Sequence, residues 1–262
     1  MSTTAIEHAP GLWIRGFTPP LALTDFKLVA FDMDSTLINL ECVDEIADAA
    51  GRKAEVAAIT EAAMRGEITD YKDSLRRRVA LLQGVSQAHL DRVYFERMAL
   101  NPGAEALVNA CKAAGLKVLI VSGGFTEFTG RLRERLGVDF VRSNELEWAP
   151  GGADGRPMLT GRMVDQAWGD ICDGAEKRRT LLEVASLIGA SPSQCIAVGD
   201  GANDLPMMAA AGLSIAYHAK PAVREKAMIA ITSGGLDRAL EVLLPRGGAN
   251  LLRPHAPSLQ NR

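Results

Sequence analysis

Residues 27–37 read KLVAFDMDSTL, an apolar run that ends in two aspartates, Asp32 and Asp34, only two positions apart. Like charges at that spacing repel each other, and neither carboxylate is cheap to remove from water. A helix cap accounts for one acid but not for both. In an extended segment, residues two positions apart face the same way, so the two acids share one space. The stretch therefore predicts a strand that ends at a cation site, with the two acids in different roles.

The composition is typical of a globular protein in which helices pack on a sheet. The chain has 262 residues, is 47% hydrophobic and 5% aromatic, and carries a net charge of −3. That size can bury one large core, or a core domain with a smaller second domain. The small negative charge excludes a general nucleic-acid or membrane-surface binder. No apolar run approaches the length of a membrane span. From the charge and the missing span together, we expect neither nucleic acid nor membrane among its partners.

Cysteine usage and the first residues favour a cytoplasmic protein. The four cysteines have no CxxC spacing and no neighbouring histidine that would complete a zinc site. We interpret them as reduced thiols rather than as structural disulfides. Residues 1–16 lack a basic stretch followed by an apolar core, so no signal peptide is expected. The cysteines are Cys42, Cys111, Cys172 and Cys195.

The pattern along the chain predicts an α/β fold, a doubly wound and mostly parallel sheet with helices on both faces. One segment departs from the helix–strand alternation: it contains four helical stretches and no strand, which predicts a small helical-bundle cap inserted after the first strand. A Gly/Pro-rich centre within residues 145–164 predicts a hairpin. The predicted organisation is a partly ordered leader over 1–26, the α/β core over 27–42 and 101–246, the cap over 43–100, and a flexible tail over 247–262.

Three predicted strands end in polar residues that can carry chemistry. They end in FDMDST (31–36), VSGG (121–124) and VGDGAND (198–204). In parallel α/β sheets the site lies beyond the carboxyl ends of the strands, so neighbouring endings converge on one crevice. Asp200 then adds a third carboxylate to Asp32 and Asp34, and a hard divalent cation such as Mg²⁺ would relieve their repulsion.

The second ending has two interpretations. Ser122 and Gly123, placed before a predicted helix, suit a phosphate seat made of backbone N–H groups and a hydroxyl. Ser-Gly-Gly is equally an ordinary turn, and on these residues alone the two are evenly matched. Lys177, in the first turn of its predicted helix, would serve as a point charge if it reached a phosphoryl oxygen, although an exposed surface lysine is the usual case.

Taken in order, DMDST, VSGGF, Lys177 and VGDGAND resemble the four motifs of the haloacid dehalogenase superfamily of phosphohydrolases. The resemblance is closer still to its phosphoserine phosphatase family, which has an acid matching Glu41 in DSTLINLE and an arginine matching Arg78 in SLRRRVALLQG. It runs from about residue 27 to residue 243 and implies a Rossmannoid core with an inserted cap. Tyr71 stands where this family leads us to expect phenylalanine, which bears on the polarity of the pocket.

The resemblance implies a role for each matching residue. Asp32 is the nucleophile and Asp34 the general acid and base. It also implies that Mg²⁺ is held by Asp32, Asp34 and Asp200, with Asp34 contributing its backbone carbonyl. The implied phosphoryl ligands are Ser122, Gly123, Lys177 and Asn203.

The resemblance further implies a small-molecule substrate, L-phosphoserine, which is hydrolysed to serine and phosphate in the last step of serine biosynthesis. Glu41 would then receive the ammonium of the substrate and Arg78 its carboxylate. Without the resemblance, Arg76, Arg77 and Arg78 are better interpreted as a solvated helix face. We expect a monomer or a homodimer.

Other functions stay open at this point. A related phosphatase or a phosphotransferase could act on another small phosphomonoester. A phospho-accepting signalling domain also uses an aspartate at a strand end and Mg²⁺, but it needs neither Asp34 as a proton donor nor a cap. An inactive relative acting as a binding module would not need the complete set of acids.

Overall fold

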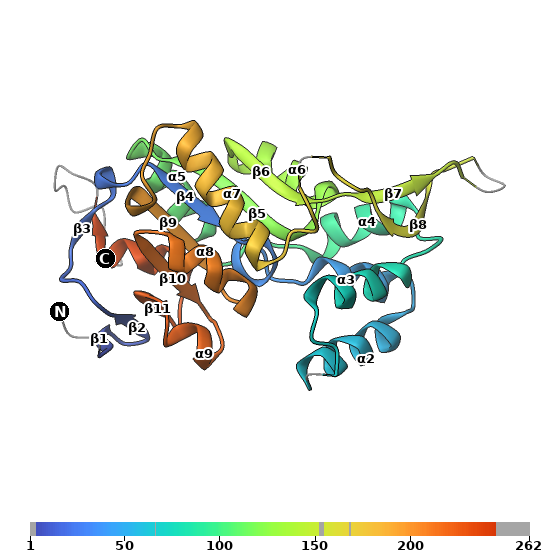
Figure 1. Ribbon diagram of the computed structural model, residues 1–262, viewed down its shortest axis with the longest axis horizontal. Coiled ribbons are helices and arrows are strands. Elements are labelled where there is room, and N and C mark those ends of the chain that lie inside the picture. Colours follow the sequence, from blue (N-terminus) through green and yellow to red (C-terminus); the bar gives the residue numbers. More distant parts are fainter. Residues whose placement is uncertain (1–3, 66, 152–154, 168, 245–262) are drawn as a thin grey trace, which may run out of the picture.

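The computed structural model describes residues 4–65, 67–151, 155–167 and 169–244. An eight-stranded sheet with the order β1-β2-β11-β10-β9-β4-β5-β6 runs through the centre (Figure 1). Strands β4, β5, β6, β9, β10 and β11 are parallel to one another, which confirms the predicted fold class. The parallel strands are β4 (Leu28–Phe31), β5 (Lys117–Phe125), β6 (Phe140–Asn144), β9 (Cys195–Gly199), β10 (Leu213–Tyr217) and β11 (Ile229–Ile231).

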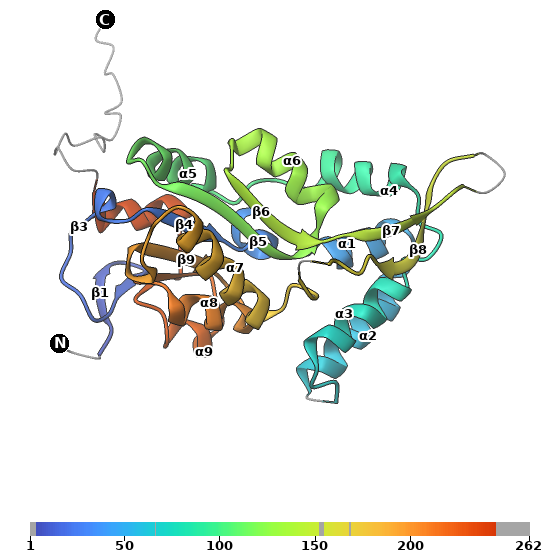
Figure 2. The same ribbon diagram turned by 45° about the horizontal axis from the view of Figure 1, so that its top comes forward.

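Strand β4 shows why the fold is doubly wound. All four of its residues are buried, and side chains alternate between the two faces of a strand. Val29 and Phe31 pack in the core that contains α5 and α6, whereas Leu28 and Ala30 pack in the core that contains α7 and α8. Figure 2 shows these helices on opposite faces of the sheet. The helices are α5 (Ala104–Ala113), α6 (Thr126–Leu136), α7 (Gly174–Leu187), α8 (Leu205–Ala210) and α9 (Pro221–Arg224).

The segment predicted as a leader extends the sheet. Strands β1 (Ile6–Ala9) and β2 (Leu12–Ile14) form an antiparallel pair, and β2 pairs antiparallel with β11. Leu12 and Ile14 face the core while Trp13 faces outward. A second, two-stranded sheet joins β3 (Leu21–Ala22) to β12 (Leu243–Leu244). The predicted tail, residues 247–262, lies outside the described residues.

Helices occupy the segment predicted as the cap. It lies between β4 and α5, and its far end projects away from the sheet at α2 and α3 (Figure 2). Its boundaries as a separate domain stay a prediction, since α1 shares its buried side chains with the main core. The cap helices are α1 (Cys42–Ala49), α2 (Lys53–Met64), α3 (Tyr71–Ala80) and α4 (Gln87–Arg92).

Two kinds of contact fasten this cap to the core. Strands β7 (Leu146–Ala149) and β8 (Met158–Met163) form the expected hairpin, and β8 meets the cap through main-chain hydrogen bonds: Gly84 N donates to Leu159 O, and Leu159 N donates to Val85 O, both at 2.8 Å. On α3, Lys72 Nζ lies 2.7 Å from Asp170 Oδ2 and 3.3 Å from Asp173 Oδ2. The cap is therefore held at the hairpin as well as by its chain connections.

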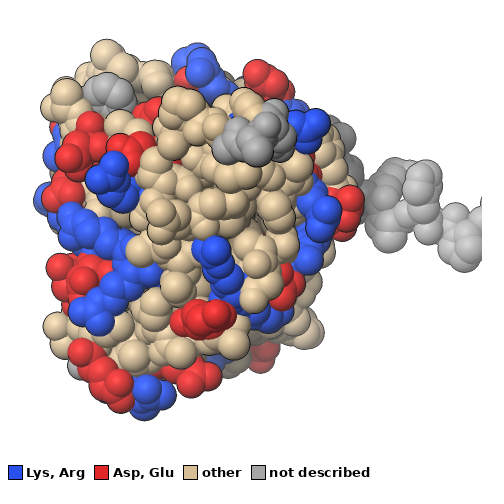
Figure 3. Space-filling view, turned by 90° about the vertical axis from the view of Figure 1, so that its right-hand side faces the viewer, with Lys and Arg blue, Asp and Glu red and all other residues tan. Residues whose placement is uncertain are grey.

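The surface at the cap end carries both signs of charge. Figure 3 shows basic and acidic side chains interspersed on this face, and Arg97 pairs with Glu45 and Asp48 in the cap. In the part of the chain that the structure describes, no helix combines the length and apolarity needed to cross a membrane.

The packing of β2 makes a testable statement about the N-terminal residues. Replacing Leu12, which is fully buried, with alanine should lower the free energy of unfolding by about 2–5 kcal/mol, the cost of emptying a core site. Ile6→Ala on β1, whose side chain is exposed, should change it by less than about 0.5 kcal/mol. Urea titration of both variants measures the difference, and equal midpoints would show that these strands are not part of the cooperative core.

Candidate active site

The three polar strand endings converge on one cavity. The cavity has a volume of about 750 Å³ and is lined from the core and from the cap. Lys177 lies just behind the lining and is completely buried. All of the predicted site residues are therefore brought together at the carboxyl edge of the sheet. Those on the cavity wall are Asp32, Asp34, Glu41, Arg78, Ser122, Gly123, Asp200 and Asn203.

Asp32 follows β4 directly and is 5% exposed. Its Oδ1 accepts a hydrogen bond from Met33 N at 2.7 Å and lies 2.7 Å from Lys177 Nζ. It thus caps the next helical turn, a role that the simpler interpretation of the sequence gave to Asp34, while also facing a buried cation. Burial, followed by the charge of Asp204, raises the pKa of Asp32 well above its usual value, and Lys177 opposes that rise.

Lys177 is shared between two carboxylates. Its Nζ lies 2.7 Å from Asp204 Oδ1 as well as from Asp32 Oδ1. Burial lowers the pKa of this ammonium, but the charges of Asp204 and Asp32 outweigh burial and hold the pKa well above its ordinary value. Lys177 therefore stays charged at neutral pH, and it is not the exposed surface lysine that its sequence position alone would suggest.

Asp204 is the residue that the predicted site omitted. Its Oδ2 accepts hydrogen bonds from the backbone N–H groups of Asp200, at 3.1 Å, and Gly201, at 3.0 Å, while Oδ1 receives Lys177. It thereby fixes both the lysine and the loop that carries Asp200. The signal in the sequence was the second acid in GDGAND, four positions after the first.

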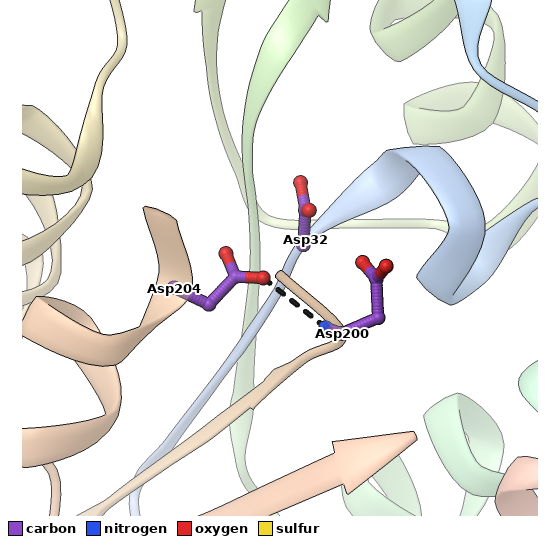
Figure 4. A group of neighbouring side chains, drawn as sticks. All are labelled: Asp32, Asp200 and Asp204. Atoms are coloured by element: carbon purple, nitrogen blue, oxygen red, sulfur yellow. Dashed lines mark hydrogen bonds between the residues drawn. The ribbon is translucent and has the colours of Figure 1, made fainter. Parts of the chain in front are cut away.

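Three carboxylates form a cluster that suits a divalent cation. One ligand oxygen from each of Asp32, Asp200 and Asp204 lies within 4.8 Å of the others (Figure 4). Burial, then the charges of Asp204 and Glu41, raises the pKa of Asp200 to about 7. So much negative charge in an enclosed space is what an oxygen-seeking cation such as Mg²⁺ would neutralise. The donor set therefore fits the predicted metal.

Asp34 has different surroundings from Asp32. Its carboxylate accepts hydrogen bonds from Cys42 N and Cys42 Sγ, each at 3.1 Å. Burial and then the charge of Glu41 raise the pKa of Asp34 to about 7, against the hydrogen bonds from Cys42. Of the two acids, Asp32 is paired with the ammonium of Lys177, whereas Asp34 can hold a proton near neutral pH.

Strand β5 ends at Phe125, but its pairing with β6 is irregular between Val121 and Phe125, so the Ser-Gly-Gly segment interrupts the regular ladder directly before α6, as its position before a helix predicted. Ser122 Oγ accepts from Gly124 N at 2.9 Å. A Cβ added to Gly123 would lie 2.1 Å from Tyr71 Oη, and one added to Gly124 would lie 2.6 Å from Met33 Cε. A larger residue at Gly123 or Gly124 would therefore have to displace the tip of the Tyr71 or Met33 side chain.

One face of α3 lines part of the cap side of the cavity, together with residues of α1 and α2. Tyr71, Ser74, Leu75 and Arg78 all line it, at the i, i+3, i+4 and i+7 positions that share one face of a helix. The Arg78 side chain is 13% exposed, and its nearest acid, Asp44, is 4.0 Å away. The buried Nε of Arg78 has no hydrogen-bond partner among the residues that the structure describes.

The other two arginines of α3 are placed differently. Arg77 is 56% exposed and pairs with Asp73 one turn earlier. Arg76 lines a separate hollow beside the β7–β8 hairpin. Glu41 lies in the site cavity, and its Oε1 accepts a hydrogen bond from Ser35 Oγ at 2.7 Å. Of the three arginines, only Arg78 faces the same cavity as Asp32, a distinction that the repeated RRR sequence could not make.

Comparison with known proteins agrees with this geometry. The model of the haloacid dehalogenase-like hydrolases matches residues 26–212. A phosphoserine phosphatase from Albidiferax ferrireducens is 69% identical over 245 residues, covering 94% of this chain and all of that protein.

Solved structures show the same relationship. The unliganded crystal structure of a probable phosphoserine phosphatase from Vibrio cholerae has 40% identity and a TM-score of 0.73, and the match covers 88% of this chain and 68% of that one. A phospho-aspartyl intermediate analogue of a phosphoserine phosphatase has 37% identity and a TM-score of 0.73, over 84% of this chain and 99% of the other. The chain belongs to the haloacid dehalogenase-like hydrolases and, within them, to the phosphoserine phosphatase family.

Proposed function

We propose that the protein is a cytoplasmic, Mg²⁺-dependent phosphomonoester hydrolase that converts O-phospho-L-serine to L-serine and phosphate, completing serine biosynthesis. The observation that carries this proposal is that the unpartnered Nε of Arg78 and the carboxylate of Asp32 belong to one cavity among the described residues. A phosphorylated amino acid needs a cation to receive its carboxylate, which Arg78 offers, and a nucleophile beside a second cation for its phosphoryl group, which Asp32 and Lys177 offer. The relatives named phosphoserine phosphatase support the same substrate.

In the first step, an Asp32 carboxylate oxygen attacks phosphorus and forms an aspartyl-phosphate as the bond from phosphorus to the seryl oxygen breaks. Lys177, 2.7 Å from Asp32 Oδ1, orients the nucleophile and balances charge on the phosphoryl oxygens. Ser122, Gly123 and Asn203 line the cavity around it and are the remaining phosphoryl ligands. Positioning and charge stabilisation of this kind supply most of what phosphoryl transfer needs.

Asp34 moves the proton in both steps. The seryl alkoxide is a poor leaving group, so Asp34 gives its proton to that oxygen as the bond breaks. Asp34, now ionised, takes a proton from the water that attacks the aspartyl-phosphate, and phosphate leaves. Its hydrogen bonds from Cys42 hold the carboxyl group in position between these two transfers.

Asp32 and Asp200, together with the backbone carbonyl of Asp34, are the proposed Mg²⁺ ligands. When bound, the ion supplies positive charge that shields the phosphoryl oxygens from the incoming carboxylate. Asp204 is not among these ligands, because its oxygens already accept hydrogen bonds from Lys177 and from two backbone N–H groups. It holds Lys177 and the loop of Asp200 in position.

Removing the nucleophile should abolish turnover. Asp32→Asn should lower the rate of Mg²⁺-dependent phosphate release from L-phosphoserine by about 10³-fold or more, because the amide cannot form the aspartyl-phosphate. Asp165→Asn, an exposed acid outside the cavity, is the matched control and should retain wild-type activity. Trifluoroberyllate should inhibit the wild type by occupying the carboxylate. An Asp32→Asn variant as fast as the wild type would contradict the mechanism.

Asp34→Asn should make activity depend on the leaving group. Release of serine should fall by about 10²–10⁴-fold, the usual contribution of a proton donor. With p-nitrophenyl phosphate, whose leaving group needs no proton, a rapid burst of about one nitrophenolate per site should precede slow hydrolysis of the intermediate. Stopped-flow absorbance measures the burst. Wild-type steady-state rates on both substrates would rule out Asp34 as the proton carrier.

Arg78→Ala should separate recognition from chemistry. The kcat/KM for L-phosphoserine should fall by about 10²-fold or more, because a charge-assisted contact to the carboxylate is lost. Hydrolysis of p-nitrophenyl phosphate should change by no more than a few fold. Arg77→Ala, one residue earlier and exposed, should leave both activities unchanged. Equal losses on the two substrates would instead favour another small phosphomonoester as the substrate.

A further inference from the structure

The hydroxyl of Tyr71 belongs to the site cavity and has no protein partner. Tyr71 opens α3 and lines the cavity. Among the described residues its Oη makes no hydrogen bond, and it is not one of the side-chain atoms that are sealed from solvent. A ligand that enters the cavity can therefore reach this hydroxyl and supply the partner that the protein does not.

The position of this hydroxyl indicates which part of the ligand it meets. Oη occupies the space directly against Gly123, only 2.1 Å from where a Cβ would stand. Gly123 and Ser122 form the strand ending assigned to the phosphoryl group. The hydroxyl therefore faces the phosphoryl end of the cavity.

The electrostatic surroundings keep the hydroxyl in its donor form. Burial is the largest influence on Tyr71 and raises its pKa, while the positive charges of Lys177 and Arg78 only partly oppose that rise. A protonated phenol beside buried Lys177 has one hydrogen to donate, and a phosphoryl oxygen is a strong acceptor.

We propose that the Tyr71 hydroxyl donates a hydrogen bond to a phosphoryl oxygen of the substrate, so that the cap binds phosphate directly in addition to recognising the amino acid. The phosphoserine part of this statement rests on the proposed function, but the phosphate contact would serve any small phosphomonoester. Tyr71 and Arg78 lie two helical turns apart on one face of α3. Helix α3 thus contacts both ends of the ligand, the phosphoryl group through Tyr71 and the carboxylate through Arg78.

The test compares Tyr71→Phe with the wild type, using p-nitrophenyl phosphate as substrate and inorganic phosphate as competitive inhibitor. Loss of one hydrogen bond to a charged group should weaken inhibition by phosphate about tenfold, with a similar fall in kcat/KM. Tyr94→Phe, the same change outside the cavity beside Phe128, should leave phosphate inhibition unchanged. Unchanged phosphate inhibition in Tyr71→Phe would overturn the proposal.

A second measurement uses the wild-type protein. A crystal structure with orthovanadate should place Tyr71 Oη within about 3.0 Å of a vanadate oxygen, and a separation beyond about 3.6 Å would overturn the contact. This test is independent of the substrate assignment. If the wild type fails to hydrolyse phosphoserine while phosphate inhibition still depends on Tyr71, the proposed substrate is wrong and the phosphate contact stands.

Discussion

The buried ammonium of Lys177, held between Asp32 and Asp204, is the interaction on which the site depends. A buried charge is tolerable only when it is paired and hydrogen-bonded. Here one cation compensates two carboxylates from separate strand endings, and it thereby ties β4 to β9 and to α7. Removing the ammonium would leave two largely buried acids without the cation that compensates their charge. The site therefore owes its geometry to the same charges that its chemistry requires.

The sheet makes this arrangement possible. Because β4 is hydrogen-bonded to β5 on one side and to β9 on the other, the endings that carry Asp32, Ser122 and Asp200 are neighbours at one edge. The burial of β4 on both faces fixes its register, so the first acid cannot slip along the strand. The cap then covers the space above this edge with residues of α1, α2 and α3.

Much of this was predictable from the sequence, and the failures have physical causes. The apolar runs ending in acids, the helical cap and the hairpin were all recognisable because each has a strong local pattern. Strand β2, which lies between β1 and β11, was not, since three residues show too little alternation to distinguish a strand from a leader. Asp204 was visible as a further acid of the third strand ending, but its pairing with Lys177 was not predictable because that lysine is distant in sequence. Only the family resemblance could single out Arg78 as the ligand, because residues 76, 77 and 78 are all arginine and the local sequence does not distinguish them.

The main-chain seam between the cap and the β7–β8 hairpin has a mechanical consequence. Gly84 and Val85 are hydrogen-bonded to Leu159 through the main chain. The cap therefore cannot rotate about its two chain connections while these hydrogen bonds are intact and the hairpin stays in place. A displacement of the cap must either break these two hydrogen bonds or move the hairpin together with the cap. Farther along the chain from the hairpin lies Asp173, the residue that caps α7. Lys72 of α3 adds a second link, because its Nζ lies 3.3 Å from Asp173 Oδ2, so the cap also contacts the N-cap residue of the helix that bears Lys177.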